Sequence, residues 1–183
     1  MSVEEIVEPT FLGRLMLEVA RFQDWALGYD QSDGRYEYGS GEWECNYDRW
    51  SELYDAVLKY AASGSVKAWP DEAMKAVLYA VARDREDQYL AEEIRVRHSA
   101  TLVALAEAVL TGGEADAKWQ LAEELGRLCP ASVEVERLLL ILARDEHEYV
   151  RRRALEALNR IGSSAVEQLA RAALNEPVEQ SFS

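Results

Sequence analysis

Hydrophobic side chains recur every three or four positions along most of the chain, which is the spacing of one face of an α-helix. Over residues 10–29 the repeating positions are Leu12, Leu15, Val19, Phe22 and Ala26. A comparable pattern, often closed by glycine or proline, predicts eight more helices. They cover about 47–63, 70–83, 86–97, 99–111, 115–128, 133–143, 146–161 and 164–175. The spacing therefore predicts an all-α chain of short helices joined by short turns.

Similar strings of residues recur within this helical part. The string Ala-Arg-Asp at 82–84 returns at 143–145, and the apolar spacing over 117–128 overlays that over 150–161. The two recurrences lie 61 and 33 positions apart, which corresponds to about two units and one unit of roughly thirty residues. This length is typical of helical hairpins that repeat along a chain. We therefore predict hairpins stacked in series within a single domain over 1–183.

The composition agrees with a helical chain. Ala, Leu, Glu and Arg make up 88 of the 183 residues, and only 10 glycines and 4 prolines interrupt them. All four are strong helix formers, whereas the β-branched residues that strands favour are scarce. We exclude an all-β sandwich and a doubly wound parallel sheet on this ground.

One segment, residues 30–46, lacks the helical spacing. Three glycines and two serines bring turn chemistry, which predicts a loop. The strings at 35–38 and 42–45 alternate polar and aromatic or apolar residues, so a small β-hairpin is the alternative. We accordingly expect an atypical aromatic and acidic helical cap over 1–69, helical repeats over 70–176 and a frayed tail over 177–183.

The clearest motif lies in the last third of the chain. It consists of Asp145, Val150, Arg151, Ala154, Ala157, Leu158, Ile161 and Gly162. This run resembles the second helix of a HEAT-like repeat, of the kind found in phycobilisome-lyase-type HEAT proteins, most clearly at residues 133–175. The resemblance implies an α-α superhelix, a HEAT-like solenoid of stacked hairpins, in which Asp145 and Arg151 form part of a hydrogen-bonded ladder between repeats. The small side chains of Ala154 and Ala157 would permit close approach of a neighbouring helix.

The chain is strongly acidic. It has 34 Asp and Glu against 20 Lys and Arg, a formal net charge of −14 at pH 7. Affinity for nucleic acid comes mostly from Lys and Arg at phosphates, and only four lysines are present, so we expect no nucleic-acid partner. No apolar run approaches the roughly 20 residues of a membrane span, and the acidic start lacks a secretory leader. We therefore expect no contact with a membrane. Cys45 and Cys129 lie in no metal or redox spacing, which favours free thiols and a cytoplasmic protein.

Acidic and aromatic residues gather in the atypical segment. Nine of the fourteen Trp and Tyr residues fall between positions 25 and 60, and residues 24–55 carry a local net charge of −7. Aromatic side chains in a loop favour a contact surface, and acids beside them attract a basic partner. The predicted partner-binding residues are Tyr36, Tyr38, Trp43, Asp30, Asp33, Glu37, Glu42 and Glu44. The other interpretation, that this segment caps the helical stack, stays open beside it.

No catalytic constellation is present in the sequence. Neither of the two histidines, His98 and His147, belongs to a zinc-binding spacing, and the sequence contains no serine-nucleophile elbow. We therefore predict no catalytic residue, no metal and no cofactor.

These observations favour a non-catalytic protein–protein interaction module. A small acidic inhibitor of a basic protein is typical of an immunity protein against a toxin. One alternative, which the resemblance implies, is a HEAT-like bilin lyase-type enzyme or chaperone whose aromatic residues line a chromophore groove. Another is a scaffold subunit of a larger complex, whose helices bearing Lys118, Arg152 and Glu156 hold a partner helix. The oligomeric state stays open.

Overall fold

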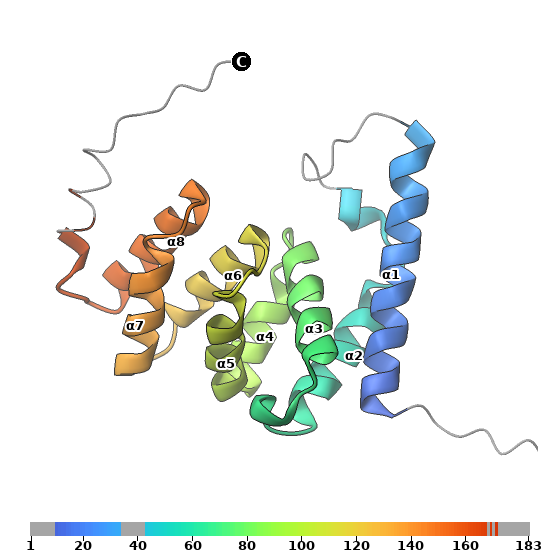
Figure 1. Ribbon diagram of the computed structural model, residues 1–183, viewed down its shortest axis with the longest axis horizontal. Coiled ribbons are helices and arrows are strands. Elements are labelled where there is room, and N and C mark those ends of the chain that lie inside the picture. The colour runs from blue at the N-terminus through green and yellow to red at the C-terminus, as the bar shows by residue number, and fades with distance from the viewer. Residues whose placement is uncertain (1–9, 34–42, 168, 170, 172–183) are drawn as a thin grey trace, which may run out of the picture.

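The computed structural model describes residues 10–33, 43–167, 169 and 171, and these are helical almost throughout (Figure 1). The α-helices are α1 (Phe11–Asp33), α2 (Trp50–Ala62), α3 (Asp71–Arg83), α4 (Tyr89–Arg97), α5 (Ser99–Val109), α6 (Ala115–Leu125), α7 (Val133–Leu142) and α8 (Glu148–Arg160). Two short 3-10 helices, η1 (Trp43–Asn46) and η2 (Val66–Ala68), flank α2. Within the described residues there is no strand, so the predicted all-α fold is confirmed.

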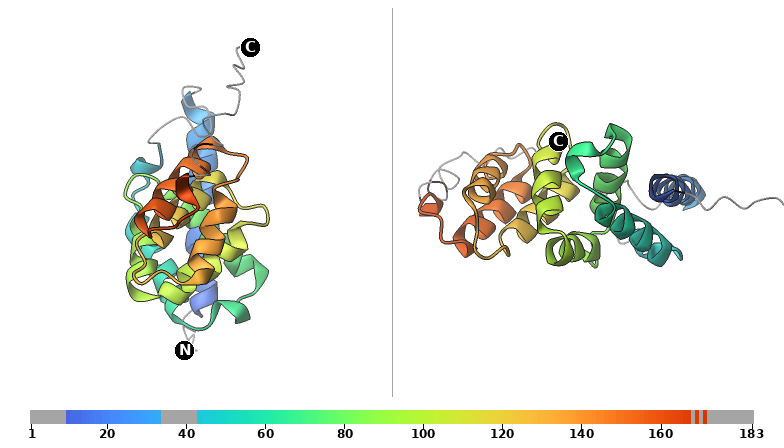
Figure 2. Two further views of the ribbon diagram at one scale, coloured as in Figure 1. Left: turned by 90° about the vertical axis from the view of Figure 1, so that its left-hand side faces the viewer. Right: turned by 90° about the horizontal axis from the view of Figure 1, so that it is seen from below.

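The helices follow one another in a row, with α1 at one end and α8 at the other (Figures 1 and 2). The odd-numbered helices α1, α3, α5 and α7 contact each other in series, and so do the even-numbered helices α2, α4, α6 and α8. Helix α3 also lies against α6. The arrangement is a series of hairpins stacked side by side in two layers, as a HEAT-like superhelix requires.

Local chemistry explains several helix ends. The Ser132 hydroxyl accepts a hydrogen bond from the backbone N–H of Val135 at 3.2 Å, which caps the start of α7. Pro70 precedes α3, where its missing N–H is not needed. Gly112 and Gly162 adopt positive φ angles of 96° and 75° just after α5 and α8, a conformation that glycine adopts without strain. These residues stop the helices and allow the chain to reverse.

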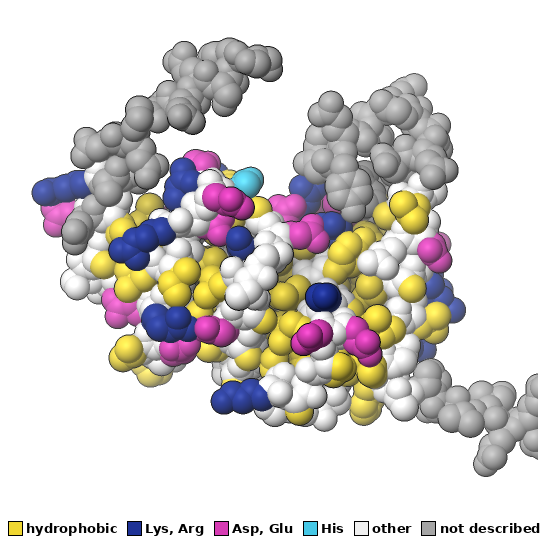
Figure 3. Space-filling model, viewed as in Figure 1, with side chains coloured by type: hydrophobic (Ala, Val, Ile, Leu, Met, Phe, Trp, Pro, Cys, Tyr) yellow, Lys and Arg dark blue, Asp and Glu magenta, His cyan; other side chains and the backbone are white. Residues whose placement is uncertain are grey.

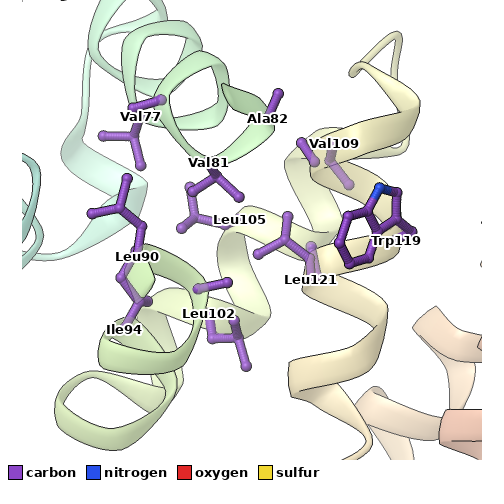
Figure 4. Packing of buried hydrophobic residues seen from close by; sticks show 14 of the residues in the cluster. Val77, Val81, Ala82, Leu90, Ile94, Leu102, Leu105, Val109, Trp119 and Leu121 are labelled. Carbon is purple, nitrogen blue, oxygen red and sulfur yellow. The ribbon is translucent and has the colours of Figure 1, made fainter. Parts of the chain in front are cut away.

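A single cluster of buried hydrophobic residues runs through the stack, from Leu15 in α1 to Leu158 in α8. Its centre contains Val81, Leu90, Leu105 and other aliphatic side chains that α3, α4, α5 and α6 direct toward one another (Figure 4). Burial of this apolar surface provides the main stabilisation of the fold. The cluster crosses the predicted boundary at residue 69 without a break.

The principal departure from the sequence-based expectations concerns residues 30–46. Helix α1 continues to Asp33, four residues beyond its predicted end. Residues 43–46, most of the second arm of the alternative β-hairpin, form the 3-10 helix η1. That part of the hairpin prediction is therefore wrong. Residues 34–42, which contain the first arm, lie outside the described residues, and so does half of the predicted last helix, namely residues 168, 170 and 172–175.

Candidate functional site

The predicted partner-binding residues fall into three groups. Tyr36, Glu37, Tyr38 and Glu42 lie outside the described residues, so their role stays a prediction. For Asp30 and Asp33 the structure describes a helical backbone in α1, and for Trp43 it describes a backbone in η1. Glu44 is the one member of the set whose side chain is described.

Glu44 is buried and makes an internal ion pair. Its carboxylate lies 3.2 Å from Nη2 of Arg85, and its backbone carbonyl accepts a 2.8 Å hydrogen bond from the indole N–H of Trp50. A buried carboxylate that already has a cationic partner does not present its charge to another protein. In the described structure Glu44 attaches η1 to the segment that follows α3, and its role toward a partner stays a prediction.

A groove lies along the edge of the stack where the linkers within the hairpins come together. We call it the linker groove, and its volume is about 810 Å³. It is lined by Glu44 of η1, Trp50 and Tyr54 of α2, Arg83 at the end of α3, residues 84–88 between α3 and α4, Asp116 and Trp119 of α6, and His147 and Tyr149 at the start of α8. In Figure 3, acidic, basic and histidine side chains gather along the upper edge of the view, while hydrophobic side chains dominate the middle of that face.

Aromatic rings form much of the wall of the linker groove. The rings of Trp50 and Tyr54 have their centroids 5.2 Å apart, and Tyr54 in turn lies 4.9 Å from Tyr89. On the other side, Trp119 and Tyr149 meet edge to face at 5.3 Å. Such contacts hold the rings in fixed orientations, so they present a preformed aromatic surface.

The cations of the linker groove have partners within the chain. Arg83 is buried and lies 2.7 Å from Glu114, whereas Arg85 lies between Glu44 at 3.2 Å and Asp116 at 3.6 Å. These pairs neutralise most of the positive charge in the groove and tie the linkers of successive hairpins together.

Two carboxylates at the groove remain uncompensated. Glu86 and Asp87 are exposed, and among the described residues neither carboxylate has a hydrogen-bond or ion-pair partner. They lie in the linker between α3 and α4, next to the aromatic wall. The groove therefore combines aromatic faces with exposed negative charge.

Asp84 is a buried carboxylate that fixes the position of Tyr54 in the wall of the linker groove. It is 2% exposed, and its carboxylate accepts 2.7 Å hydrogen bonds from the hydroxyl of Tyr54 and from the backbone N–H of Leu90. Burial raises the pKa of Asp84 to about 6, although these hydrogen bonds oppose the rise. Asp84 therefore positions Tyr54 against the start of α4.

A second depression, of about 740 Å³, lies between α2 and α4, and we call it the outer groove. It is lined by Ser51, Tyr54, Asp55, Leu58, Lys59, Ala62, Asp87, Tyr89, Arg97 and His98. Tyr54 and Asp87 line both grooves, so the two meet at these residues.

The repeat motif occupies the last hairpin. Val150, Ala154, Ala157 and Leu158 are fully buried and Ile161 is half-buried. Gly162 follows α8 with its positive φ. The carboxylate of Asp145 accepts 2.8 Å and 2.9 Å hydrogen bonds from Lys118 Nζ and the His147 N–H. Burial works against ionisation of Asp145, yet these two hydrogen bonds and the positive charge of Lys118 together lower its pKa.

Two contacts bear on the ladder that the resemblance implies. Lys118 in α6 reaches Asp145 in the next hairpin, which links two repeats. Arg151 donates to the backbone carbonyls of Asp145 and Glu146, at 3.0 Å and 2.8 Å, within its own repeat. Asp84 is the counterpart of Asp145 one pair of hairpins earlier, and it too binds a side chain of the preceding hairpin, Tyr54.

Sequence reasoning missed most of the groove. A tyrosine follows the shared Ala-Arg-Asp string in both places, as Tyr89 and as Tyr149, and this recurrence could have drawn attention to them. No comparable recurrence in the sequence points to Trp119. The exposed carboxylates of Glu86 and Asp87 look like any others in a chain with 34 acids.

Other types of site find little support in the part of the chain that the structure describes. No three residues of His, Cys, Asp or Glu gather there in a way that could hold a metal ion. None of its helices combines the length and the apolar character that crossing a membrane demands. Cys129 is exposed and makes no disulfide.

Comparison with known proteins identifies the repeats. Residues 102–181 match the family model of HEAT repeats, a region that includes α6, α7 and α8. The match shows HEAT repeats over this region, and together with the all-helical stack it supports a HEAT-like repeat protein. Neither the search of curated proteins nor that of solved structures gave a significant match. HEAT repeats are generally protein-interaction modules, and nothing in these comparisons supports the lyase-type resemblance.

Proposed function

We propose that this chain is a non-catalytic protein-binding module whose partner carries a basic surface. The observation that carries the proposal is the linker groove, where Glu86 and Asp87 are exposed and uncompensated beside the aromatic wall. Aromatic side chains are frequent anchors of protein interfaces, and complementary charge accelerates and orients binding.

The net charge of the whole chain favours the same class of partner. At −14 the chain attracts basic proteins over distances of about a Debye length, roughly 8–10 Å at moderate salt. Fast capture is what an inhibitor of a toxic basic enzyme needs. An immunity protein against a toxin is therefore the specific form of the proposal.

Affinity capture with the tagged chain from lysate of its own cell, read by mass spectrometry, tests this proposal. The wild type is compared with Glu86→Gln/Asp87→Asn, and the matched control is Asp71→Asn/Glu72→Gln, which removes the same charge from two adjacent exposed acids in α3. We expect a basic protein that wild type and control retain and that the groove variant or high salt releases.

Two results would contradict the proposal. One is a set of captured proteins that is unchanged by both salt and the groove variant. The other is a captured enzyme whose activity the purified chain leaves unaffected, which would exclude the inhibitor form. Conversion of a small-molecule substrate by the purified chain would overturn the non-catalytic assignment.

A further inference from the structure

The linker groove and the outer groove share Tyr54 and Asp87, so they adjoin at these two residues and together make a depression along the edge of the stack. We infer that this depression binds an extended basic segment of a partner protein, with a lysine or arginine side chain at Asp87 where the two grooves meet. The inference rests on the proposed function, and it adds the form of the ligand and its position.

The shape of the depression favours an extended occupant. It begins at His147 and Tyr149, at the start of α8, passes the linker between α3 and α4, and ends at His98 after α4. Its lining thus comes from four successive hairpins, and each groove has a volume in the range of ordinary ligand pockets. A compact protrusion would fill one groove, whereas an extended segment can place side chains in both.

The charges along the depression favour a basic occupant. Its cations already have acidic partners: Arg83 and Arg85 pair as described above, and Lys59 lies 2.9 Å from Asp55. Arg97 pairs with Glu93, which lies one turn earlier in α4. The uncompensated charges are therefore carboxylates, those of Glu86 and Asp87, and the local field is negative.

The aromatic residues at the junction favour lysine or arginine in particular. Tyr89 is 38% exposed, and its ring lies 4.9 Å from that of Tyr54. A cation placed over an exposed aromatic ring gains a cation–π attraction, and the aliphatic part of its side chain covers the apolar surface. Asp87, two residues before Tyr89, would then supply the counter-charge for the same side chain.

Binding of a synthetic peptide to the full chain tests this inference. The probe is a short fluorescent peptide in which lysines alternate with serine and leucine, and its control has glutamate at each lysine position. Binding is followed by fluorescence anisotropy at low and high salt. We expect the lysine peptide to bind, with an affinity that falls as salt rises, and the glutamate peptide not to bind.

Variants locate the binding on the surface. The variant Glu86→Gln/Asp87→Asn removes the ion pair with the bound cation, and Tyr89→Ala removes the aromatic ring beneath it. We expect each change to raise Kd by roughly 3- to 10-fold. Tyr89→Phe, which keeps the ring, should leave Kd within about twofold of the wild-type value. Equal weakening by the control pair Asp71→Asn/Glu72→Gln would overturn the inference, since binding would then follow net charge alone.

Cross-linking distinguishes an extended ligand from a local one. A photoreactive group is attached to one or the other end of the lysine peptide, and the cross-linked residues are mapped by mass spectrometry. We expect one end to react near Tyr149 and the other near Lys59 or His98. If both ends react within a single groove, the extended placement is wrong.

The capture experiment separates failure of this inference from failure of the proposed function. If a basic partner is captured through Glu86 and Asp87 but the lysine peptide does not bind, the partner uses a folded surface, and only the inference fails. If neither the partner nor the peptide depends on these residues, both proposals fail.

Discussion

Gly126, directly after α6, lies against Ala157 in the last turn of α8. A Cβ atom added to Gly126 would lie 2.6 Å from the Cβ and 2.7 Å from the Cα of Ala157. Carbon atoms pack best at separations of about 3.5–4.0 Å, so the added methyl group would overlap its neighbour by roughly 1 Å. One of the two obstructing atoms belongs to the backbone, so a change of side-chain rotamer cannot relieve the overlap.

Two opposing effects set the magnitude for Gly126→Ala. Gly126 has a helical φ of −65°, where replacement of glycine by alanine stabilises a protein by about 0.4–1 kcal/mol through the unfolded chain. Overpacking of a tight contact costs about 1–3 kcal/mol. We expect the upper part of that range because the helices themselves must separate, which leaves a net loss of about 1–2 kcal/mol in the free energy of unfolding.

Urea unfolding followed by circular dichroism measures this loss. The control is Gly64→Ala, because a Cβ at Gly64 has no atom within 4 Å and this residue does not have a positive φ. We expect the control to be neutral or slightly stabilising. The double variant Gly126→Ala/Ala157→Gly removes the Cβ–Cβ overlap but keeps the overlap with the Cα of residue 157, so it should recover only part of the loss. Stabilisation by Gly126→Ala equal to that of the control would refute the reasoning.

Three further changes test the polar contacts of the fold. The pKa of Asp84 lies at about 6 in the folded chain and at 3.8 in the reference state, so Asp84 binds more protons in the folded chain between these values. Its contribution to stability is therefore greatest below pH 4 and falls by about 3 kcal/mol as the pH rises past 6. The difference in urea midpoint between wild type and Asp84→Asn should follow that slope, and a constant difference would contradict it. Glu18 is fully buried between Arg14, Arg21 and Arg49. Glu18→Gln should therefore lower the melting temperature and reduce the free energy of unfolding by roughly 3 kcal/mol, whereas the control Asp24→Asn, at an exposed position of the same helix, should change little. Lys118→Met leaves Asp145 without its cation, so the Asp145 pKa measured by NMR should rise, and an unchanged value would show that the His147 N–H alone sustains ionisation.

The sequence by itself determined the helices and their serial order. Hydrophobic spacing, with glycine and proline at the ends, predicted α2 to α8 to within a few residues, because these signals act over one or two turns of a helix. The repeat motif also located the buried seam of α8, where Val150, Ala154, Ala157 and Leu158 are all fully buried.

Only the tertiary structure decided the conformation and contacts of η1. Residues 42–45 alternate as a strand would, yet residues 43–46 are helical. The ion pair of Glu44 with Arg85, 41 positions away in sequence, holds this segment. Tyr47 adds an edge-to-face contact with Phe22 at 4.8 Å. Contacts between residues so distant in sequence override a local strand preference that is worth little by itself.

The groove likewise depended on tertiary structure. Its residues come from η1, α2, α6, α8 and the linker between α3 and α4, so it exists only when the hairpins are stacked. Whether a carboxylate can pair with a partner protein also depends on tertiary structure, because the fold decides which cations of the chain lie close to it. The carboxylate of Glu44 is paired with Arg85, whereas those of Glu86 and Asp87 have no cationic partner among the described residues. Local spacing therefore specifies helices, while binding surfaces depend on how the packed helices distribute charge and aromatic side chains.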